Sequence, residues 1–185
     1  SVDIPLFNDT NFIGKAIRAL LNQTYPKNKY EIIVIDNGSS DNSKQIASSF
    51  PIVLLEERIQ RSSYAARNKG LLSAKGNIIA FTDSDCQPLP EWIQEGVKAL
   101  EKTDADLAAG KITFDFSSTR SPSEYYDAVM NIQNEECVES RKVGYTANLF
   151  VKKEVFDKIG MFPGDIKSGG DIYFTARATA SRFSI

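Results

Sequence analysis

Residues 77–88 have the sequence NIIAFTDSDCQP, in which a short apolar run ends in two carboxylates one residue apart. The apolar and aromatic content of this run predicts a buried strand from Asn77 to Thr82. Asp83 and Asp85 follow directly at its carboxyl end. Carboxylates in this position can turn the chain and cap the next helix, or they can bind a hard divalent cation together with substrate phosphates. The stretch alone leaves both interpretations open.

The residues before this stretch alternate short β-rich runs with amphipathic segments. Helix caps are available at Asn8, Asp9 and Thr10, and Pro90 suits the first turn of a later helix. This alternation is typical of βαβ units and predicts an α/β fold with a mostly parallel, Rossmann-like sheet flanked by helices. Strands are predicted over 2–6, 31–35, 52–55 and 77–82, and helices over 8–23, after the turn at 36–41, over 63–73 and over 90–102.

Ligands of an open parallel sheet bind beyond the carboxyl ends of its strands. Asp36 and the pair Asp83 and Asp85 all fall at such ends in the predicted sheet. The second part of the chain is less regular, and a loop containing Gly and Pro is expected over 160–170. The remaining predicted elements are a strand over 107–114, an extended segment over 143–151, and helices over 123–137, 153–159 and 171–181.

Composition narrows the possible functions of the chain. Its 185 residues predict one domain, 1–185, and a net charge of −2 with pI ≈ 5.3 argues against a nucleic-acid partner. The absence of histidine leaves only carboxylate, Tyr, Lys or Cys side chains as a general base. Two cysteines and no long apolar run predict a cytoplasmic protein, with peripheral association at the inner face of the cell membrane left open.

Five segments, in order, resemble the family 2 glycosyltransferases, which are enzymes of the GT-A fold. Each segment alone is a weak signal, but their order and spacing along nearly the whole chain make the resemblance specific. It implies an inverting transferase that uses a nucleotide-diphosphate sugar, in first place a UDP-sugar. The five segments are IPLFN at 4–8, LNQTY at 21–25, VIDNGSSD at 34–41, AARNKG at 65–70 and FTDSDC at 81–86.

The resemblance also implies roles for individual residues. Asp36 would accept a hydrogen bond from the imide N–H of uracil, and Arg67 would lie close to the base or the diphosphate. Asp85 would ligate Mn²⁺ or Mg²⁺, and Asp83 would bind the ribose or assist in holding the metal. A capped turn and a solvated surface arginine are the alternatives for Asp36 and Arg67. The implied donor-binding residues are Pro5, Leu6, Asn8, Asp36, Arg67, Asp83, Ser84, Asp85 and Asn148, the last in a segment that strand packing explains equally well.

The segment from Ser168 to Asp171 resembles the late acidic motif of the family, which implies that Asp171 is the catalytic base. Gly170 departs from the pattern, because an acidic residue is common there. Helix capping is the alternative role for Asp171 and is compatible with the first. On this interpretation residues 1–105 form the nucleotide-sugar-binding half, and residues 106–185 form the half that binds the acceptor and carries the base.

Two departures from the family refine the expected reaction. The Gln-x-x-Arg-Trp motif of processive synthases is absent, which favours a single addition to a glycan, a lipid-linked or a small-molecule acceptor. The chain also ends soon after the Asp171 helix, as a C-terminally truncated domain would. Two alternatives remain: a nucleotidyltransferase, which would carry a Gly-rich basic loop after its first strand, and a domain of this fold that binds nucleotide sugar or glycan without turnover.

Overall fold

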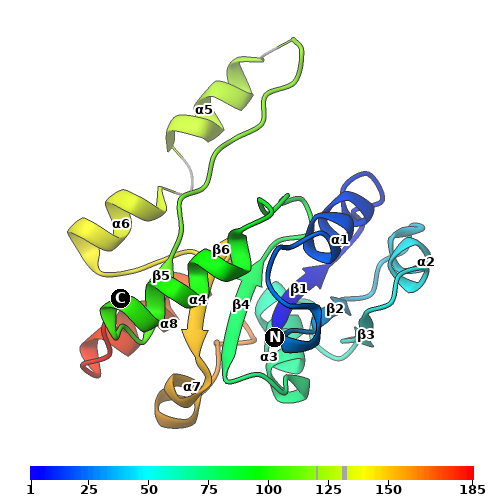
Figure 1. Ribbon diagram of the computed structural model, residues 1–185. Helices are drawn as coiled ribbons and strands as arrows, with labels where there is room; N and C mark the ends of the chain where they lie inside the picture. The colour runs from blue at the N-terminus through cyan, green and yellow to red at the C-terminus, as the bar shows by residue number, and fades with distance from the viewer. Residues whose placement is uncertain (120, 131–132) are drawn as a thin grey trace.

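Six strands form one mixed sheet in the computed structural model, which describes residues 1–119, 121–130 and 133–185 (Figure 1). The strand order is β3-β2-β1-β4-β6-β5, and the first four strands of the chain run parallel. β6 is antiparallel to both of its neighbours, β4 and β5. The strands are β1 (Val2–Leu6), β2 (Ile32–Asp36), β3 (Val53–Glu56), β4 (Ile78–Thr82), β5 (Leu107–Ala109) and β6 (Asn148–Lys152). The predicted α/β fold with a mostly parallel sheet is confirmed.

The order of the strands creates a switch point between β1 and β4. The chain builds outward from β1 to β2 and β3, then crosses to place β4 on the other side of β1. The carboxyl ends of β1, β2 and β4 therefore meet at one edge of the sheet, and Asn148 at the start of β6 pairs with Thr82 at that same edge. Such a switch point is where an open α/β sheet offers a ligand crevice.

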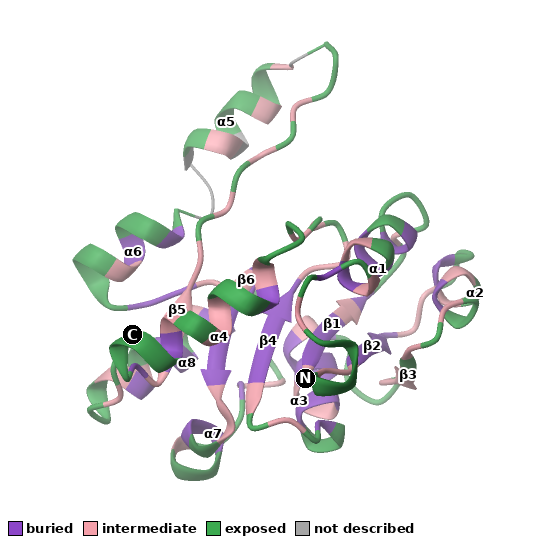
Figure 2. Cartoon of the chain, viewed as in Figure 1, coloured by how far each residue is buried: buried purple, intermediate pink, exposed green. Residues whose placement is uncertain are grey.

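Helices cover both faces of the sheet, so the central strands are mostly buried, as Figure 2 shows. α1 (Ile13–Leu21), α2 (Ser43–Ser48) and α4 (Trp92–Thr103) pack on one face. α3 (Ser63–Ser73), α7 (Lys153–Ile159) and α8 (Gly170–Ala180) pack on the other. Removing the fully buried Phe81 and Phe174 from water stabilises the fold by about 1.5–3 kcal/mol per side chain. A 3₁₀ turn, Lys27–Lys29, completes this part of the chain.

The first helix is shorter than predicted. α1 begins at Ile13 rather than near Asn8, and within the described chain its N-cap Phe12 makes no capping hydrogen bond through its side chain. The polar residues before it are engaged elsewhere: Asn8 has a left-handed φ of 50° and accepts from the Ser40 amide at 2.8 Å, while Thr10 donates to Asp41 at 2.5 Å. The predicted caps instead join the two loops that follow β1 and β2. α4 likewise begins two residues after Pro90, at Trp92.

The second part of the chain departs most from expectation. β5 ends at Ala109, short of the strand predicted over 107–114, and the next two residues are bonded to Asn148 of β6: the Gly110 amide donates to its carbonyl at 3.0 Å, and its side chain donates to the Lys111 carbonyl at 2.9 Å. The single helix predicted over 123–137 is wrong: the structure has α5 (Pro122–Met130) and α6 (Asn134–Arg141), and residues 131–132 lie outside the described residues. Asn134, the first residue of the second helix, joins it to two distant segments, because its side chain donates to the Gly110 carbonyl and accepts from the Tyr145 amide.

Residues 111–119 and 121–130, here named the arm, project away from the body of the molecule (Figure 1). Tyr125, Tyr126 and Val129 are exposed on it. None of the helices in the described ranges combines the length and apolar character needed to cross a membrane. Because its described side chains are exposed or only partly buried, the arm contributes little to the hydrophobic core.

Candidate active site

A cavity of about 630 Å³ opens at the carboxyl-end edge of the sheet, a size typical of pockets that hold small molecules. Its walls come from the ends of β1 and β4, the start of α3, the turn before β6 and the start of α8. Residues separated by more than 160 positions in the sequence thus share one pocket. Of the residues predicted from sequence, Pro5, Leu6, Arg67, Asp83, Ser84, Asp85 and Asp171 line it.

The acidic stretch after β4 forms a group that could hold a cation. Ligand atoms of Asp83, Asp85 and Cys86 all lie within 4.8 Å of one another. Loss of hydration inside the pocket, followed by the charge of Asp83, raises the pKa of Asp85. Burial and the two carboxylates raise the pKa of the Cys86 thiol to about 12, so the thiol stays protonated at neutral pH. Two carboxylates that repel each other and a neutral thiol fit a hard, oxygen-seeking ion such as Mn²⁺ or Mg²⁺.

Arg67 joins this acidic group to α3. Its side chain is only 4% exposed and forms a salt bridge with Asp83, so the alternative of a solvated surface arginine is wrong. The guanidinium also lies over the ring of Tyr64, 5.6 Å from its centroid. α3 can approach β1 closely because residue 70 is glycine: a Cβ there would lie 2.0 Å from a carboxylate oxygen of Asp3. The helix is thereby positioned so that Arg67 lines the pocket beside the strand-end carboxylates.

Asp171 belongs to another part of the cavity lining, in the first turn of α8, and is only 7% exposed. One carboxylate oxygen accepts from the Tyr64 hydroxyl at 3.1 Å and from the Ile172 amide at 3.0 Å. The other accepts from the amide of Thr146 at 3.2 Å and from its hydroxyl at 3.3 Å. The contacts to Tyr64 and Thr146 reach well beyond the helix terminus, so helix capping alone does not account for this side chain.

The loop over 160–169 contains neither helix nor strand, as predicted, and side chains of α3 and α8 fasten it. Asn68 donates to the Phe162 carbonyl at 2.9 Å and accepts from the Phe162 amide at 3.0 Å. Ser62 donates to the Ile166 carbonyl, and Arg177 donates to the Met161 carbonyl. These bonds fix the path of the chain that leads into Asp171.

Three predicted donor residues lie outside the cavity lining given by the described residues. Asn8 bridges two loops, as described above. Asp36 is fully buried, and its carboxylate accepts from the amides of Gly38 and Ser39 at 3.3 Å each. Asn148 accepts from the Trp92 indole at 2.8 Å and so links β6 to α4. In these positions all three serve the framework around the pocket, and their contact with a donor remains a prediction.

Several pocket residues were not singled out from the sequence. Thr146 lines the cavity, where Asn148 was predicted to lie. The backbone amide of Asn148 donates to the Tyr145 carbonyl, so the chain turns here before β6 begins. Tyr64 could have been found only from its nearness to Arg67 along α3. Arg61 and Lys167 are isolated surface cations in the sequence, with no pattern around them. The remaining unforeseen lining residues include Phe7 and Asn37.

The fold and the strand-end acidic pocket define an α/β protein of the GT-A glycosyltransferase type. The family model for glycosyl transferase family 2 matches residues 1–164, and the chain belongs to that family. It is 41% identical to the glycosyltransferase AglE of Haloferax volcanii over 190 residues, covering 100% of this chain and 62% of AglE. The chain therefore spans less than two thirds of that relative's length.

Solved structures share the fold of the whole chain. TarS of Staphylococcus aureus superposes with a TM-score of 0.75 at 21% identity, covering 96% of this chain and 32% of that one. The mannosyltransferase PcManGT of Pyrobaculum calidifontis, solved in complex with GDP-Man and Mn²⁺, gives a TM-score of 0.72 at 23% identity, covering 97% and 50%. A TarS fragment, 1–349, has been crystallised with UDP-GlcNAc.

Proposed function

We propose that this chain is the catalytic domain of an inverting, metal-dependent glycosyltransferase that adds one sugar from a nucleotide-diphosphate sugar to an acceptor hydroxyl. The single observation that carries the proposal is that one cavity is lined both by the acidic group after β4 and by the buried carboxylate of Asp171. Asp83 and Asp85 belong to the part of the lining that follows β4, here named the sheet wall, and Asp171 belongs to the part that begins α8, here named the helix wall. The two walls thus offer separate places for a leaving diphosphate and for a base.

The donor would lie along the ends of β1 and β4. Pro5 and Leu6 supply an apolar floor beside Asp83 and Asp85. Asp83 and Asp85 would hold Mn²⁺ or Mg²⁺, which when bound supplies positive charge that stabilises the leaving diphosphate. Exposed Arg61 and Lys167 on the cavity wall would attract the same phosphates.

The nucleotide base remains the least constrained part of the donor. We propose UDP, which gains support from the TarS fragment crystallised with UDP-GlcNAc, whereas PcManGT was solved with GDP-Man. Recognition of the uracil imide by Asp36 would require exchange of its two backbone donors, since Asn37 rather than Asp36 lines the cavity. A comparison of the two nucleotides therefore belongs in the first experiment.

Asp171 would act as the general base. The acceptor oxygen forms a bond to the anomeric carbon, the bond from that carbon to the diphosphate oxygen breaks, and its electron pair leaves with the nucleoside diphosphate. The acceptor proton passes to the Asp171 carboxylate, and attack from the face opposite the leaving group inverts the configuration. The Thr146 hydroxyl is a rotor that bonds Asp171 at 3.3 Å, and it can turn away to give the acceptor hydroxyl access.

The first test is calorimetric titration of UDP, and separately of GDP, into the protein with Mn²⁺ and again with chelator. We expect binding that needs the metal and that weakens about tenfold or more in Asp85→Ala, because a direct metal ligand is lost. Asp157→Ala, at an exposed position on α7, is the matched control and should bind as the wild type does. Binding of neither nucleotide with metal, or equal binding by Asp85→Ala, would overturn the donor assignment.

The acceptor is proposed only as a class. A glycan, a lipid-linked or a small-molecule hydroxyl compound would meet Asp171 at the α8 wall, and a lipid-linked acceptor would bring the protein to a membrane surface. Screening acceptors with the donor found by calorimetry, with product stereochemistry determined by NMR, tests inversion directly. Retention of the donor's anomeric configuration would remove Asp171 from the role of base in a single displacement.

A binding domain without turnover is the second candidate. It is favoured by one observation: four hydrogen bonds engage the two oxygens of Asp171, which fill the usual accepting capacity of a carboxylate. The two candidates separate in Asp171→Asn. A transferase loses product formation and keeps nucleotide binding, whereas for a binding domain no product forms with the wild type either.

A further inference from the structure

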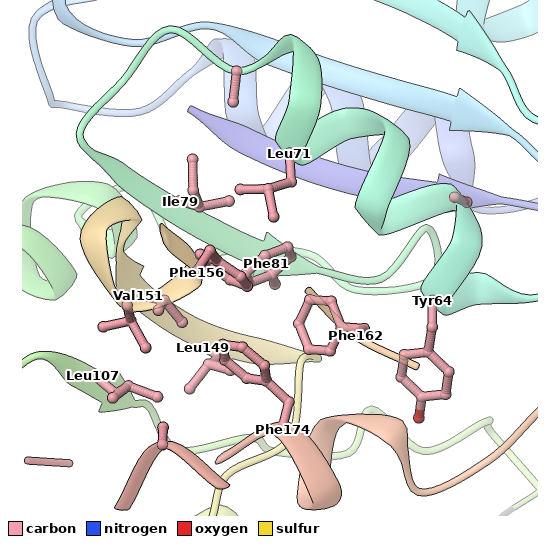
Figure 3. Close-up of a cluster of buried hydrophobic side chains, with 14 of the residues drawn as sticks. Tyr64, Leu71, Ile79, Phe81, Leu107, Leu149, Val151, Phe156, Phe162 and Phe174 are labelled. Atoms are coloured by element: carbon pink, nitrogen blue, oxygen red, sulfur yellow. The ribbon is translucent and has the colours of Figure 1, made fainter. Parts of the chain in front are cut away.

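Tyr64 reaches from α3 to the start of α8 and contacts Asp171. Its side chain is 5% exposed, and its hydroxyl lies 3.1 Å from a carboxylate oxygen of Asp171, 107 positions further along the chain. Figure 3 shows the ring hanging from α3 beside Phe162, with the hydroxyl at the end away from that helix. The centroid of the Tyr64 ring lies 5.9 Å from that of Phe162, and the Arg67 guanidinium lies over the Tyr64 ring. The hydroxyl therefore has little freedom to point elsewhere.

Gly170 makes this approach possible. A Cβ at residue 170 would lie 2.7–2.9 Å from three ring carbons of Tyr64, closer than side-chain atoms pack. Residue 170 is the first residue of α8 and does not have a positive φ, so its backbone conformation does not itself require glycine. The glycine is explained by the ring that lies against it.

We propose that Tyr64 is a positioning residue for Asp171, and that Gly170 is the opening through which its ring reaches the carboxylate. The inference rests on the proposed role of Asp171 as base. Tyr64 and the Ile172 amide hold one carboxylate oxygen, which leaves the other bonded to Thr146, a residue that also lines the cavity. A carboxylate held at a single angle presents the same oxygen to each acceptor, and loss of that alignment slows the reaction.

The contact between Tyr64 and Asp171 can be measured without any substrate. Burial, then the charge of Asp171 and the hydrogen bond to it, raises the pKa of Tyr64. In protein labelled at the tyrosine Cζ carbons with ¹³C, Tyr64 is assigned as the signal missing from Tyr64→Phe. We expect its titration midpoint to move to lower pH in Asp171→Asn and to stay unchanged in Asp165→Asn, an exposed position in the loop. An unmoved midpoint in Asp171→Asn would overturn the inference.

The functional test measures the rate at which nucleoside diphosphate is released from a nucleotide sugar. The nucleotide is the one that binds best in the calorimetric titration, and the sugar is transferred to water or to an acceptor hydroxyl. Tyr64→Phe keeps the ring and its stacking and removes only the donor to Asp171. We expect kcat to fall about tenfold, the usual effect of losing a hydrogen bond to a charged group, with KM for the donor and UDP affinity unchanged. Tyr30→Phe, which removes a half-buried hydroxyl bonded to Leu20, should leave both constants unchanged.

The outcomes separate this inference from the function on which it rests. If Asp171→Asn releases nucleotide as fast as the wild type, the proposed base is wrong. If Asp171→Asn is inactive while Tyr64→Phe equals the wild type, the base stands and the positioning role fails. A raised KM with unchanged kcat in Tyr64→Phe would make Tyr64 a donor contact, which also overturns the inference.

The role of Gly170 has its own test in a double-mutant cycle. Gly170→Ala should lower Tm in the wild type, because the new Cβ displaces the Tyr64 ring. In the Tyr64→Ala background the ring is gone, and Gly170→Ala should leave Tm unchanged or raise it, since alanine favours helix over glycine. Equal Tm shifts in the two backgrounds would show that the glycine does not serve the ring.

Discussion

The two walls of the pocket are built in different ways. The wall that carries Asp83 and Asp85 follows directly from β4, a strand in the middle of the sheet. The wall that carries Asp171 begins a helix that is reached through a loop over 160–169, and hydrogen bonds from the side chains of Ser62, Asn68 and Arg177 hold that loop. The sheet wall is therefore positioned by backbone pairing, and the helix wall by side chains.

Because the two walls are held in different ways, each suits a different task in the proposed reaction. A wall fixed by strand pairing suits a task that needs a constant geometry, such as holding a cation and a diphosphate. A wall fixed by side chains of a helix and a loop can be adjusted one contact at a time, which suits the placement of a base against different acceptors. α3 belongs to both walls, because Arg67 contacts Asp83 and Tyr64 contacts Asp171.

The largest expected effect separates the two walls by function. Asp171→Asn should reduce transfer by about 10²–10⁴-fold, because the amide cannot accept the acceptor proton. The dissociation constant of the nucleotide, measured by calorimetry with Mn²⁺, should stay within about twofold of the wild-type value, because the substitution does not change the sheet wall. Loss of binding in this variant would mean that the two walls are not separate in function.

The sequence predicts the elements of both walls and the presence of Asp83, Asp85 and Asp171 in the pocket, but it does not predict the side-chain contacts that join them, for a physical reason. The run Ile78 to Thr82 and the acids after it are local signals, since strand, turn and carboxylates lie in one stretch. The contacts of Asn148, Thr146 and Tyr64 depend on pairings between distant segments, which no local pattern encodes. The shortened β5 and the divided helix over 123–137 lie beside such contacts, because the side chains of Asn148 and Asn134 bond distant backbone groups there.

The next effect concerns the core beneath the helix wall. Phe162 is 4% exposed and packs against Phe81 and Phe174 with ring centroids 5.3 and 4.6 Å away (Figure 3). Phe162→Ala should lower the free energy of unfolding by about 3–5 kcal/mol through lost burial and a cavity. Phe12→Ala, at an exposed position before α1, is the control and should change it by less than about 1 kcal/mol.

Phe162→Ala also sharpens the comparison of the walls in the folded protein. The substitution removes the aromatic packing of the loop that leads to Asp171 and keeps the Asn68 bonds to the backbone of residue 162, while the sheet wall keeps its strand pairing. Hydrogen exchange should therefore increase over 160–172 more than over 78–82 under conditions where the variant is folded. Equal increases in the two segments would indicate that the walls share one cooperative unit.

A smaller effect concerns a buried acid of the sheet, Asp3. Among the described residues neither of its oxygens has a hydrogen-bond partner, whereas both oxygens of Asp171 accept hydrogen bonds. Burial raises the pKa of Asp3 well above its ordinary value, and Arg67 offsets only part of this. The folded protein therefore retains a proton that the unfolded chain releases above pH about 4. Stability should fall as pH rises from there toward the folded pKa, by at most about 1.4 kcal/mol per pH unit.

Urea unfolding of the wild type and Asp3→Asn at several pH values between 4 and 8 measures this contribution. The asparagine variant has no proton to retain, so its stability relative to the wild type should increase with pH. Parallel pH profiles would show that Asp3 ionises in the folded state as it does in the unfolded chain.

The smallest effect is expected in the arm. Tyr126 is 63% exposed on α5, which projects away from the body of the molecule (Figure 1). Tyr126→Ser should change the free energy of unfolding by no more than about 0.5 kcal/mol, because little apolar area is buried there. The change should also leave nucleotide binding intact, since the arm does not belong to the sheet wall. A loss of acceptor-dependent transfer with unchanged stability would instead extend the helix wall to the arm and place the distal part of the acceptor against it.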